Sequence, residues 1–343
     1  MQDFTGGGNM TANELFLERE KSFLSEYAFF TANTKGREIY CKPCPNRTEF
    51  QRDRDRILHS KSFRRLMHKT QVFLSPEDEH FRTRMTHTLE VTQISRIIAR
   101  ALRLNEDLCE AAALGHDLGH TPFGHSGETA MRQFFSPDFA HYKQSIRVVE
   151  KIENDGEGLN LTWEVKDAIL NHTGDSEAAT LEGKIIKYAD RIAYINHDID
   201  DACRAKVMCI EDIPKEIRKV LGDGHSVRIN TLVSSVIRES MDKPYIRMEK
   251  EIDEAMMELR AFLFKNIYTN TTVKAEEAKA IEMLRILFDY FVLHSDELPD
   301  VYRKNIEAEG VKRCVCDYIS GMTDRYATDL FRDLYVPNSW RRK

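Results

Sequence analysis

Residues 113–128 of the chain read ALGHDLGHTPFGHSGE and hold three histidines, one aspartate and one glutamate. These five residues are His116, Asp117, His120, His125 and Glu128. Imidazole and carboxylate groups bind divalent metal ions, and they also act as general acids and bases near neutral pH. Apolar residues directly precede the run, which predicts that it follows the end of a buried helix. Such chemistry at the end of a packed helix is typical of an enzyme.

A divalent ion needs several ligands that converge from different elements. His116 and Asp117 offer two ligands from one turn, while His87 lies on an earlier predicted helix and Asp190 on a later one. The helix that carries Asp190 is apolar on one side, so a carboxylate there needs a partner such as a metal or an arginine. His87, His116, Asp117 and Asp190 are therefore candidates for a shared metal site, with an arginine as the alternative partner of Asp190.

Helical periodicity of apolar residues extends through nearly the whole chain, so we predict an all-α fold. The expected helices span Arg52–His68, Thr86–Leu104, Glu106–Leu114, Gly127–Phe135, His141–Glu153, Trp163–Asn171, Leu181–Cys203, Ile213–Leu221, Val227–Ser240, Glu249–Asn266, Lys274–His294 and Val311–Leu334. Asn105 is the expected cap of the third of these helices. Extended structure is expected only as a short piece near Thr70–Leu74 and Phe81.

The composition is steady along the chain, so it indicates no sharp domain boundary. Residues 1–14 are interpreted as a disordered or leader segment because the chain starts MQDFTGGGN, and either Met1 or Met10 is the native start. Residues 15–210 contain the His/Asp-rich stretches and are assigned as the catalytic core. Residues 211–343 are predicted to be a helical region for packing or oligomerisation.

Length and charge exclude several classes of protein. The 343 residues are enough for a large core, and 56 acidic against 50 basic residues give a net charge of −6, which argues against a general nucleic-acid coat. No run approaches 18 apolar residues and the N-terminus lacks the apolar core of a secretory signal, so no membrane association is expected. Seven cysteines in a long chain favour reduced thiols and a cytoplasmic protein.

Four ordered blocks within residues 15–205 carry a resemblance to a known family. They read FQRDRDRILHSKSFRRLMHKTQVF, HFRTRMTHTLEVTQISR, EAAALGHDLGHTPFGHSGE and YADRIAYINHDIDDA. Together they resemble the dGTPase-like deoxynucleoside triphosphate triphosphohydrolases, a branch of the HD superfamily of metal-dependent phosphohydrolases. The resemblance implies an HD-domain helical fold with an additional helical C-terminal region. It also implies hydrolysis of dGTP or several dNTPs to a deoxynucleoside and tripolyphosphate, and it assigns the four residues above as metal ligands.

The same resemblance implies roles for further acid–base residues. His125 and Glu128, at His-x-x-Glu spacing, are similar to the family's catalytic histidine and its carboxylate partner. His120, one turn beyond His116, is expected to support the catalytic residues or to contact phosphate, and the alternative is a hydrogen bond to backbone. His141 resembles a family histidine that serves the leaving oxygen or the phosphates.

Positive charge is concentrated just upstream of the histidines, as a triphosphate substrate requires. Arg84 lies three residues before His87, so its guanidinium is expected on the metal side of the same helix. Arg65 and Arg56 lie in the basic run 47–69 and are also expected to bind substrate. The alternative is that this run forms a solvated face with ordinary ion pairs.

The sugar end of the substrate is assigned by resemblance. Tyr194 and Asp198 lie one and two turns beyond Asp190, on the same side of the helix. In the family a tyrosine stacks on the deoxyribose, while an aspartate and a glutamine bind the 3′-hydroxyl, and Tyr194, Asp198 and Gln71 match them. Tyr194 is alternatively a core residue. No residue identifies the base.

Several alternatives stay open at this stage. The function is alternatively that of another HD phosphohydrolase, such as a nucleotidase or phosphodiesterase, or of a regulatory protein that binds nucleotides or single-stranded DNA. The ion is expected to be Mn²⁺, Mg²⁺ or Ni²⁺, and the partners to be a dNTP, a nucleotide activator and further copies in a homo-oligomer. Cys41 and Cys44, with Cys314 and Cys316, offer either a zinc site or, more simply, a turn and packing.

Overall fold

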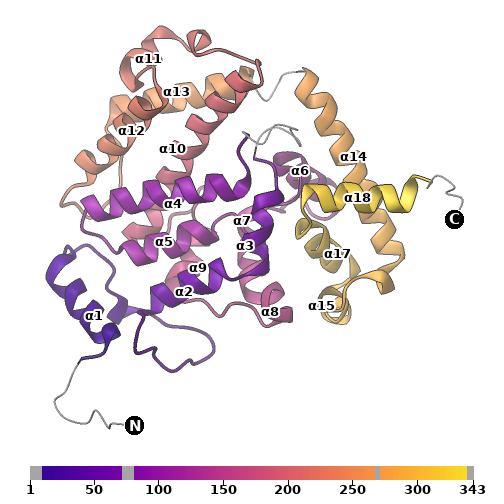
Figure 1. The fold of residues 1–343 in the computed structure, drawn as a ribbon, viewed down its shortest axis with the longest axis horizontal. Coiled ribbons are helices and arrows are strands. Elements are labelled where there is room, and N and C mark those ends of the chain that lie inside the picture. Colours follow the sequence, from indigo (N-terminus) through magenta and orange to yellow (C-terminus); the bar gives the residue numbers. More distant parts are fainter. Residues whose placement is uncertain (1–9, 72–80, 267–270, 338–343) are drawn as a thin grey trace, which may run out of the picture.

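The computed structural model describes residues 10–71, 81–266 and 271–337, which form α-helices joined by turns (Figure 1). The α-helices are α1 (Ala12–Phe23), α2 (Glu49–Leu58), α3 (Lys61–Arg65), α4 (Arg84–Ala101), α5 (Glu106–Gly115), α6 (Gly124–Phe134), α7 (His141–Arg147), α8 (Glu153–Gly156), α9 (Trp163–Leu170), α10 (Leu181–Arg204), α11 (Lys215–Leu221), α12 (His225–Ser240), α13 (Lys250–Asn266), α14 (Thr271–Leu293), α15 (Asp300–Arg303), α16 (Ile306–Glu309), α17 (Val311–Ser320) and α18 (Asp324–Tyr335). Short 3₁₀ or π turns are η1 (Thr31–Asn33), η2 (Leu66–His68), η3 (Val148–Ile152), η4 (Ile210–Asp212) and η5 (Ser295–Glu297). These described residues contain no strand, only an isolated antiparallel bridge between Thr70 and Thr83, so the all-α prediction is confirmed.

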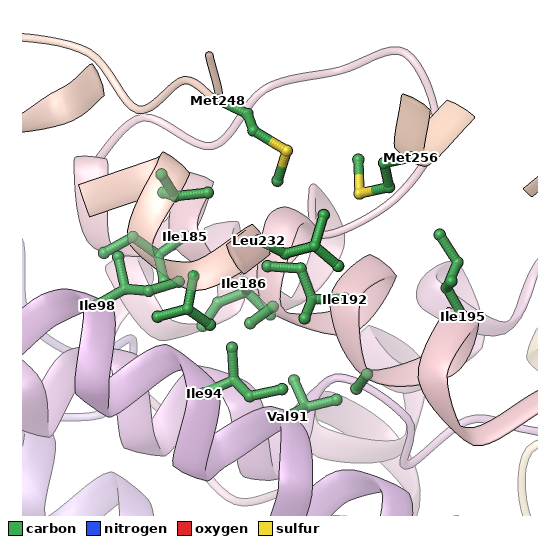
Figure 2. Packing of buried hydrophobic residues seen from close by; sticks show 14 of the residues in the cluster. Val91, Ile94, Ile98, Ile185, Ile186, Ile192, Ile195, Leu232, Met248 and Met256 are labelled. Atoms are coloured by element: carbon green, nitrogen blue, oxygen red, sulfur yellow. The ribbon is translucent and has the colours of Figure 1, made fainter. Parts of the chain in front are cut away.

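The first core forms where α4, α5 and α10 pack against one another (Figures 1 and 2). Val91, Ile94 and Ile98 repeat at helical spacing on α4 and face Ile185 and Ile192 of α10. All five are buried, and each such side chain stabilises the fold by roughly 1.5–3 kcal/mol. This packing fixes the relative position of two of the helices that carry predicted metal ligands.

Close packing also positions the end of α5. Asn105 caps this helix as predicted, because its Oδ1 accepts a hydrogen bond from Leu108 N at 3.3 Å. Gly115, the last residue of α5, lies so near α9 that a Cβ would be 2.5 Å from Ile169 Cδ1. Glycine at this position therefore lets α5 deliver His116 and Asp117 against α9.

A second core joins α6 to α14, α17 and α18 (Figure 1). The carboxylate of Asp324 accepts hydrogen bonds from Thr70 N and Phe123 N, both at 2.9 Å. Lys69 Nζ donates to Ser320 O at 2.8 Å and also to His120 O. These bonds fasten the C-terminal helices to the loop that follows α5. Meanwhile α12 and α13, also in the predicted C-terminal region, pack into the first core with α10.

Two predicted helices are interrupted in the structure. The run Arg52–His68 breaks at Ser60, whose Oγ accepts a hydrogen bond from Phe63 N and starts α3. The run Val311–Leu334 breaks before Thr323, which caps α18 in the same way. In both cases a side chain inside the apolar-periodic stretch caps the start of a new helix, so the predicted helix is divided into two.

Most of the proposed leader, residues 1–9, lies outside the described residues. Residues 72–74 of the extended piece expected near Thr70–Leu74 also lie outside them. Thr11 caps α1 through the amide of Glu14, so residues 12–14 are already helical. Among the described residues, the longest helices carry too many polar side chains to cross a lipid bilayer.

Lys69 gives the stability of this fold a pH dependence. Burial, followed by the charge of Arg65, lowers the pKa of Lys69 from 10.5 to about 7. Between pH 7 and 10 the unfolded chain therefore binds more protons than the folded chain does. We expect the unfolding free energy of the wild type, relative to Lys69→Met, to rise with pH by about 1 kcal/mol per unit in this range.

Urea unfolding at pH 7, 8 and 9 measures this difference. The same substitution at the exposed Lys61 is the control, and its difference from the wild type should stay flat. An equally flat profile for Lys69→Met would contradict the burial argument.

Candidate metal centre and active site

Four side chains from three helices converge at one point. His87 comes from α4, His116 and Asp117 from the end of α5, and Asp190 from α10. His87 Nε2 lies 3.1 Å from Asp190 Oδ1 and 3.9 Å from Asp117 Oδ2. His116 Nε2 lies 3.5 Å from Asp117 Oδ1 and 3.9 Å from Asp190 Oδ1. The structure therefore brings together all four residues that the sequence predicts as metal ligands.

The hydrogen bonds of His116 make it suitable as a ligand. Its Nδ1 lies 2.6 Å from Ala113 O, and because a carbonyl only accepts, Nδ1 carries the proton. The buried Nε2 then offers a lone pair and has no hydrogen-bond partner among the described residues. Ligand atoms of His87, His116 and Asp117 all lie within 4.8 Å of one another. This mixed nitrogen and oxygen set fits a divalent ion without selecting Mn²⁺, Mg²⁺ or Ni²⁺.

Arg84 adds a positive charge beside these groups. Its Nη1 lies 3.0 Å from Asp117 Oδ2, and its Nε donates to Thr70 O at 3.2 Å. Burial alone would raise the pKa of Asp117, but the charges of His116, His120 and Arg84 hold it well below its usual value. Asp117 is thus an anion in the buried site, as metal binding requires.

A buried chain of hydrogen bonds orients His87. Its Nδ1 lies 3.4 Å from His197 Nδ1, and His197 Nε2 contacts the Glu90 carboxylate. If His87 coordinates through Nε2, its Nδ1 proton points to His197, whose own proton then points to Glu90. Burial lowers the pKa of His197 to about 4, which keeps this ring neutral and able to accept. Glu90 and His197 therefore set the orientation of His87.

We expect Glu90→Ala to weaken metal binding by about 10- to 100-fold, the usual cost of losing a group that orients a ligand. Titration of the metal-free chain with Mn²⁺ measures the dissociation constant. Arg82 is the other charged neighbour of Glu90, at 3.4 Å, and Arg82→Gln is the matched control because it leaves the chain to His87 intact. Equal affinities in the two variants would show that Glu90 does not act through His87.

A second histidine cluster lies beside Asp117. The rings of His120 and His141 stack with centroids 4.2 Å apart. His141 Nε2 lies 3.3 Å from His172 Nε2, and His172 Nδ1 lies 2.7 Å from Ile169 O. The carbonyl fixes the His172 proton on Nδ1, so His172 Nε2 accepts from His141. His141 Nδ1 also contacts Glu128 Oε2 at 3.4 Å, so the His141 ring is held between His172 and this carboxylate.

Glu128 hydrogen-bonds to His141 and interacts electrostatically with His125, whereas the sequence predicts it as the partner of His125 alone. It accepts hydrogen bonds from His141 N at 3.2 Å and from Arg132 Nη2 at 2.8 Å. Burial would raise its pKa, but His141 and Arg132 lower it to about 2, and the charge of His125 acts in the same direction. The side chain of His125 is exposed at the cavity, and partial desolvation by the surrounding protein, followed by the charge of Arg84, lowers its pKa to about 4. His125 is therefore neutral at pH 7 beside an ionised Glu128.

These groups surround a cavity of about 450 Å³. It is lined by Gln71, Arg84, His87, Asp117, His120, His125, Thr129, His141, Thr173, Asp190, Tyr194, Asp198, Arg260, Leu263, Phe264 and Glu277. Most of the predicted substrate-binding and catalytic residues are among them, while His116 and Glu128 lie behind this lining. The cavity is large enough for a mononucleotide-sized ligand.

Arg56 and Arg65 lie outside the cavity, unlike the expectation that they bind substrate. Arg56 Nη1 donates to Leu159 O at 2.7 Å and to Asn160 O at 2.6 Å. Arg65 Nη1 donates to Gly321 O at 3.1 Å. Both guanidinium groups therefore bind backbone carbonyls instead of lining the cavity.

Sequence reasoning missed several residues of the site. His172 is one, and its position at the end of an apolar helix, before Thr173 and Gly174, was a usable signal. Arg260 and Glu277 also line the cavity, although the helical C-terminal region was interpreted as serving packing or oligomerisation. Nothing in their local sequence distinguishes them from other charged residues on amphipathic helices.

Two family models match the chain. The HD domain matches residues 84–195, and the phosphohydrolase-associated domain matches residues 246–333. The first match spans the helices that carry the four candidate ligands, and the second spans the helices that carry Arg260 and Glu277.

Similar proteins match nearly the whole chain. A deoxyguanosinetriphosphate triphosphohydrolase-like protein of Caldanaerobacter subterraneus subsp. tengcongensis is 54% identical over 331 residues, covering 96% of this chain and 98% of the relative. One from Desulfatibacillum aliphaticivorans is 46% identical, covering 96% and 99%. A solved phosphohydrolase of Bacteroides thetaiotaomicron has a TM-score of 0.52 at 17% identity, covers 82% of this chain and 68% of its own, and supports the fold alone.

Proposed function

We infer that this chain, which belongs to the deoxyguanosinetriphosphate triphosphohydrolase-like proteins with an HD domain, hydrolyses deoxynucleoside triphosphates to a deoxynucleoside and tripolyphosphate. The observation that carries this proposal is the convergence of two imidazoles and two carboxylates on a cavity that also holds Arg84 and His125. A bound divalent ion would supply charge neutralisation for the phosphates and a more acidic water.

The charged side chains suit the phosphate end of such a substrate. Arg84 would bind phosphate oxygens, because its guanidinium is buried in the lining and directed at Asp117. His125, held neutral, would accept a proton from the attacking water. His141, held between Glu128 and His172, would donate a proton to the leaving 5′-oxygen. His120 would support this pair through its stacked ring.

The other end of the cavity suits a deoxyribose and a base. Burial raises the pKa of Tyr194 to about 12, so its phenol stays neutral and offers an apolar face to the sugar. The buried Gln71 Oε1 has no hydrogen-bond partner among the described residues, which suits a contact with the 3′-hydroxyl, together with Asp198. Arg260 and Glu277, from α13 and α14, would contact the base.

Product analysis over all four dNTPs tests the proposal, each alone and in mixtures, with Mn²⁺, Mg²⁺ and Ni²⁺. Release of tripolyphosphate with a deoxynucleoside is the expected result. Turnover that appears only in mixtures would identify a nucleotide activator. Release of orthophosphate or pyrophosphate would indicate another HD phosphohydrolase instead. Intact dNTPs under every condition would favour the regulatory or single-stranded-DNA-binding alternative.

A further inference from the structure

Asp324, the first residue of α18, is a buried carboxylate that lies at the start of α6 (Figure 1). Its Oδ1 accepts a hydrogen bond from Phe123 N at 2.9 Å. Its Oδ2 accepts one from Thr70 N at 2.9 Å and another from Thr70 Oγ1. Both oxygens of this side chain are thus used to join two segments that are far apart in the sequence, and a buried carboxylate needs such partners.

The first of these segments orients Arg84. Thr70 O accepts a hydrogen bond from Arg84 Nε at 3.2 Å, and Gln71 O accepts one from Arg84 Nη2 at 3.4 Å. The side chains of Gln71 and Arg84 both line the catalytic cavity. The amide that Asp324 binds therefore belongs to the backbone that sets the direction of the Arg84 guanidinium.

The second segment is the turn that begins α6 and leads directly to His125. Phe123 has φ 60° and ψ 28°, a left-handed conformation that is unfavourable for a residue with a side chain. Gly124 follows with φ 52°, and His125 comes next and lines the cavity. A strained turn persists only where its surroundings hold it, and the bond from Phe123 N to Asp324 is such a restraint. The position of His125 thus depends on a residue of α18.

The two segments meet at Gly124. A Cβ at this position would be 3.2 Å from Arg84 Nη2 and 3.3 Å from Gln71 O, so the start of α6 packs directly on the group that orients the guanidinium. Lys69 adds a second link to the C-terminal helices, because its Nζ donates to Ser320 O at 2.8 Å and also to His120 O. Small shifts of the C-terminal helices would therefore be transmitted to both walls of the cavity.

We propose that Asp324 is a positioning residue, which holds Arg84 and His125 in the relative positions that hydrolysis requires. Its effect on turnover rests on the proposed function, whereas its effect on the two segments does not. A displacement of about 1 Å in a reacting group can cost roughly 10²-fold in rate, so a residue without contact to the substrate can matter this much. Among the described residues, Asp324 hydrogen-bonds to none of the four candidate metal ligands, and metal binding should not depend on it.

Site-resolved hydrogen exchange of the full-length chain tests the positioning without any turnover. In Asp324→Ala the amides of Thr70 and Phe123 should exchange about tenfold or more faster than in the wild type, because each loses its acceptor. The matched control is Asp329→Ala, which removes a half-exposed carboxylate from the same helix. Asp324→Asn keeps the volume and one acceptor oxygen, so it serves if the alanine variant does not fold, and it should speed exchange of at least one of the two amides. Exchange of both amides at the rates of the control would overturn the proposal.

Turnover tests the consequence for catalysis. We expect kcat of Asp324→Ala to fall by about 10- to 100-fold at unchanged metal content. In a double-mutant cycle with His125→Ala, most of this loss should disappear, because a misplaced imidazole cannot matter once the imidazole is absent. A loss of the same size in both backgrounds would refute the action through His125. If the chain hydrolyses no dNTP at all, the proposed function fails, and the exchange rates still decide whether Asp324 holds the two segments.

Discussion

Replacing His116 with alanine is expected to reduce turnover by about 10⁴-fold or more and to remove the bound metal, because one substitution deletes both a ligand and the charge neutralisation that depends on it. His116 Nε2 is a buried atom without a hydrogen-bond partner among the described residues, and it lies close to the carboxylates of Asp117 and Asp190. Asp117→Asn tests the same point with almost no change in volume. Metal content and tripolyphosphate release are measured on each purified variant.

The controls for this experiment separate loss of the metal from loss of the fold. His59 is an exposed histidine at the end of α2, and His59→Ala should retain metal and rate. Circular dichroism of Asp117→Asn should match that of the wild type, because the helix ends at Gly115 and the capping at Asn105 are untouched. A metal-free variant that keeps a tenth or more of the wild-type rate would exclude the assigned role of the cluster.

The four candidate metal ligands could be assigned because the sequence blocks that contain them resemble a known family, although only His116 and Asp117 are close in sequence. His116 and Asp117 are adjacent, and His87 and Asp190 each lie on a long helix whose apolar period is regular. Periodicity also predicted the helices that pack these residues together, since α4 and α10 meet through their buried isoleucines. When the apolar face of a helix is buried, the apolar period also determines on which side of the helix each polar residue lies.

Contacts across long sequence separations could not be predicted in the same way. Arg56 seemed suited to phosphate, but its partners are the carbonyls of Leu159 and Asn160, on a turn that its own sequence does not specify. Arg260 reaches the cavity because α13 packs on α10, and nothing near Arg260 indicates that packing. A charged residue on an amphipathic helix can face either solvent or a binding site, and only the tertiary structure determines which of the two it faces.

The second large effect is expected for His125→Ala, which should keep the metal but lower kcat by about 10²- to 10⁴-fold. This is the range expected when a positioned general acid or base is removed. The His125 ring lines the cavity, 6.4 Å from that of His120, while the ligands lie on other elements. Because desolvation by the surrounding protein and the charge of Arg84 lower the pKa of His125 to about 4, its ring has a nitrogen that can accept a proton at neutral pH. His125→Gln retains hydrogen bonding without this basicity and should be almost as slow.

Single-turnover rates and metal content together locate the defect of the His125 variants. A full complement of metal with a slow chemical step is the expected combination, and the exposed His68→Ala serves as a histidine control. If kcat of His125→Ala stays within threefold of the wild type, proton transfer must belong to His141, whose contacts with Glu128 and His172 are independent of His125. Glu128 hydrogen-bonds to His141 and acts on His125 through its charge. If His125→Ala is nearly as fast as the wild type, slow turnover of Glu128→Gln in the same assay would therefore be due to His141.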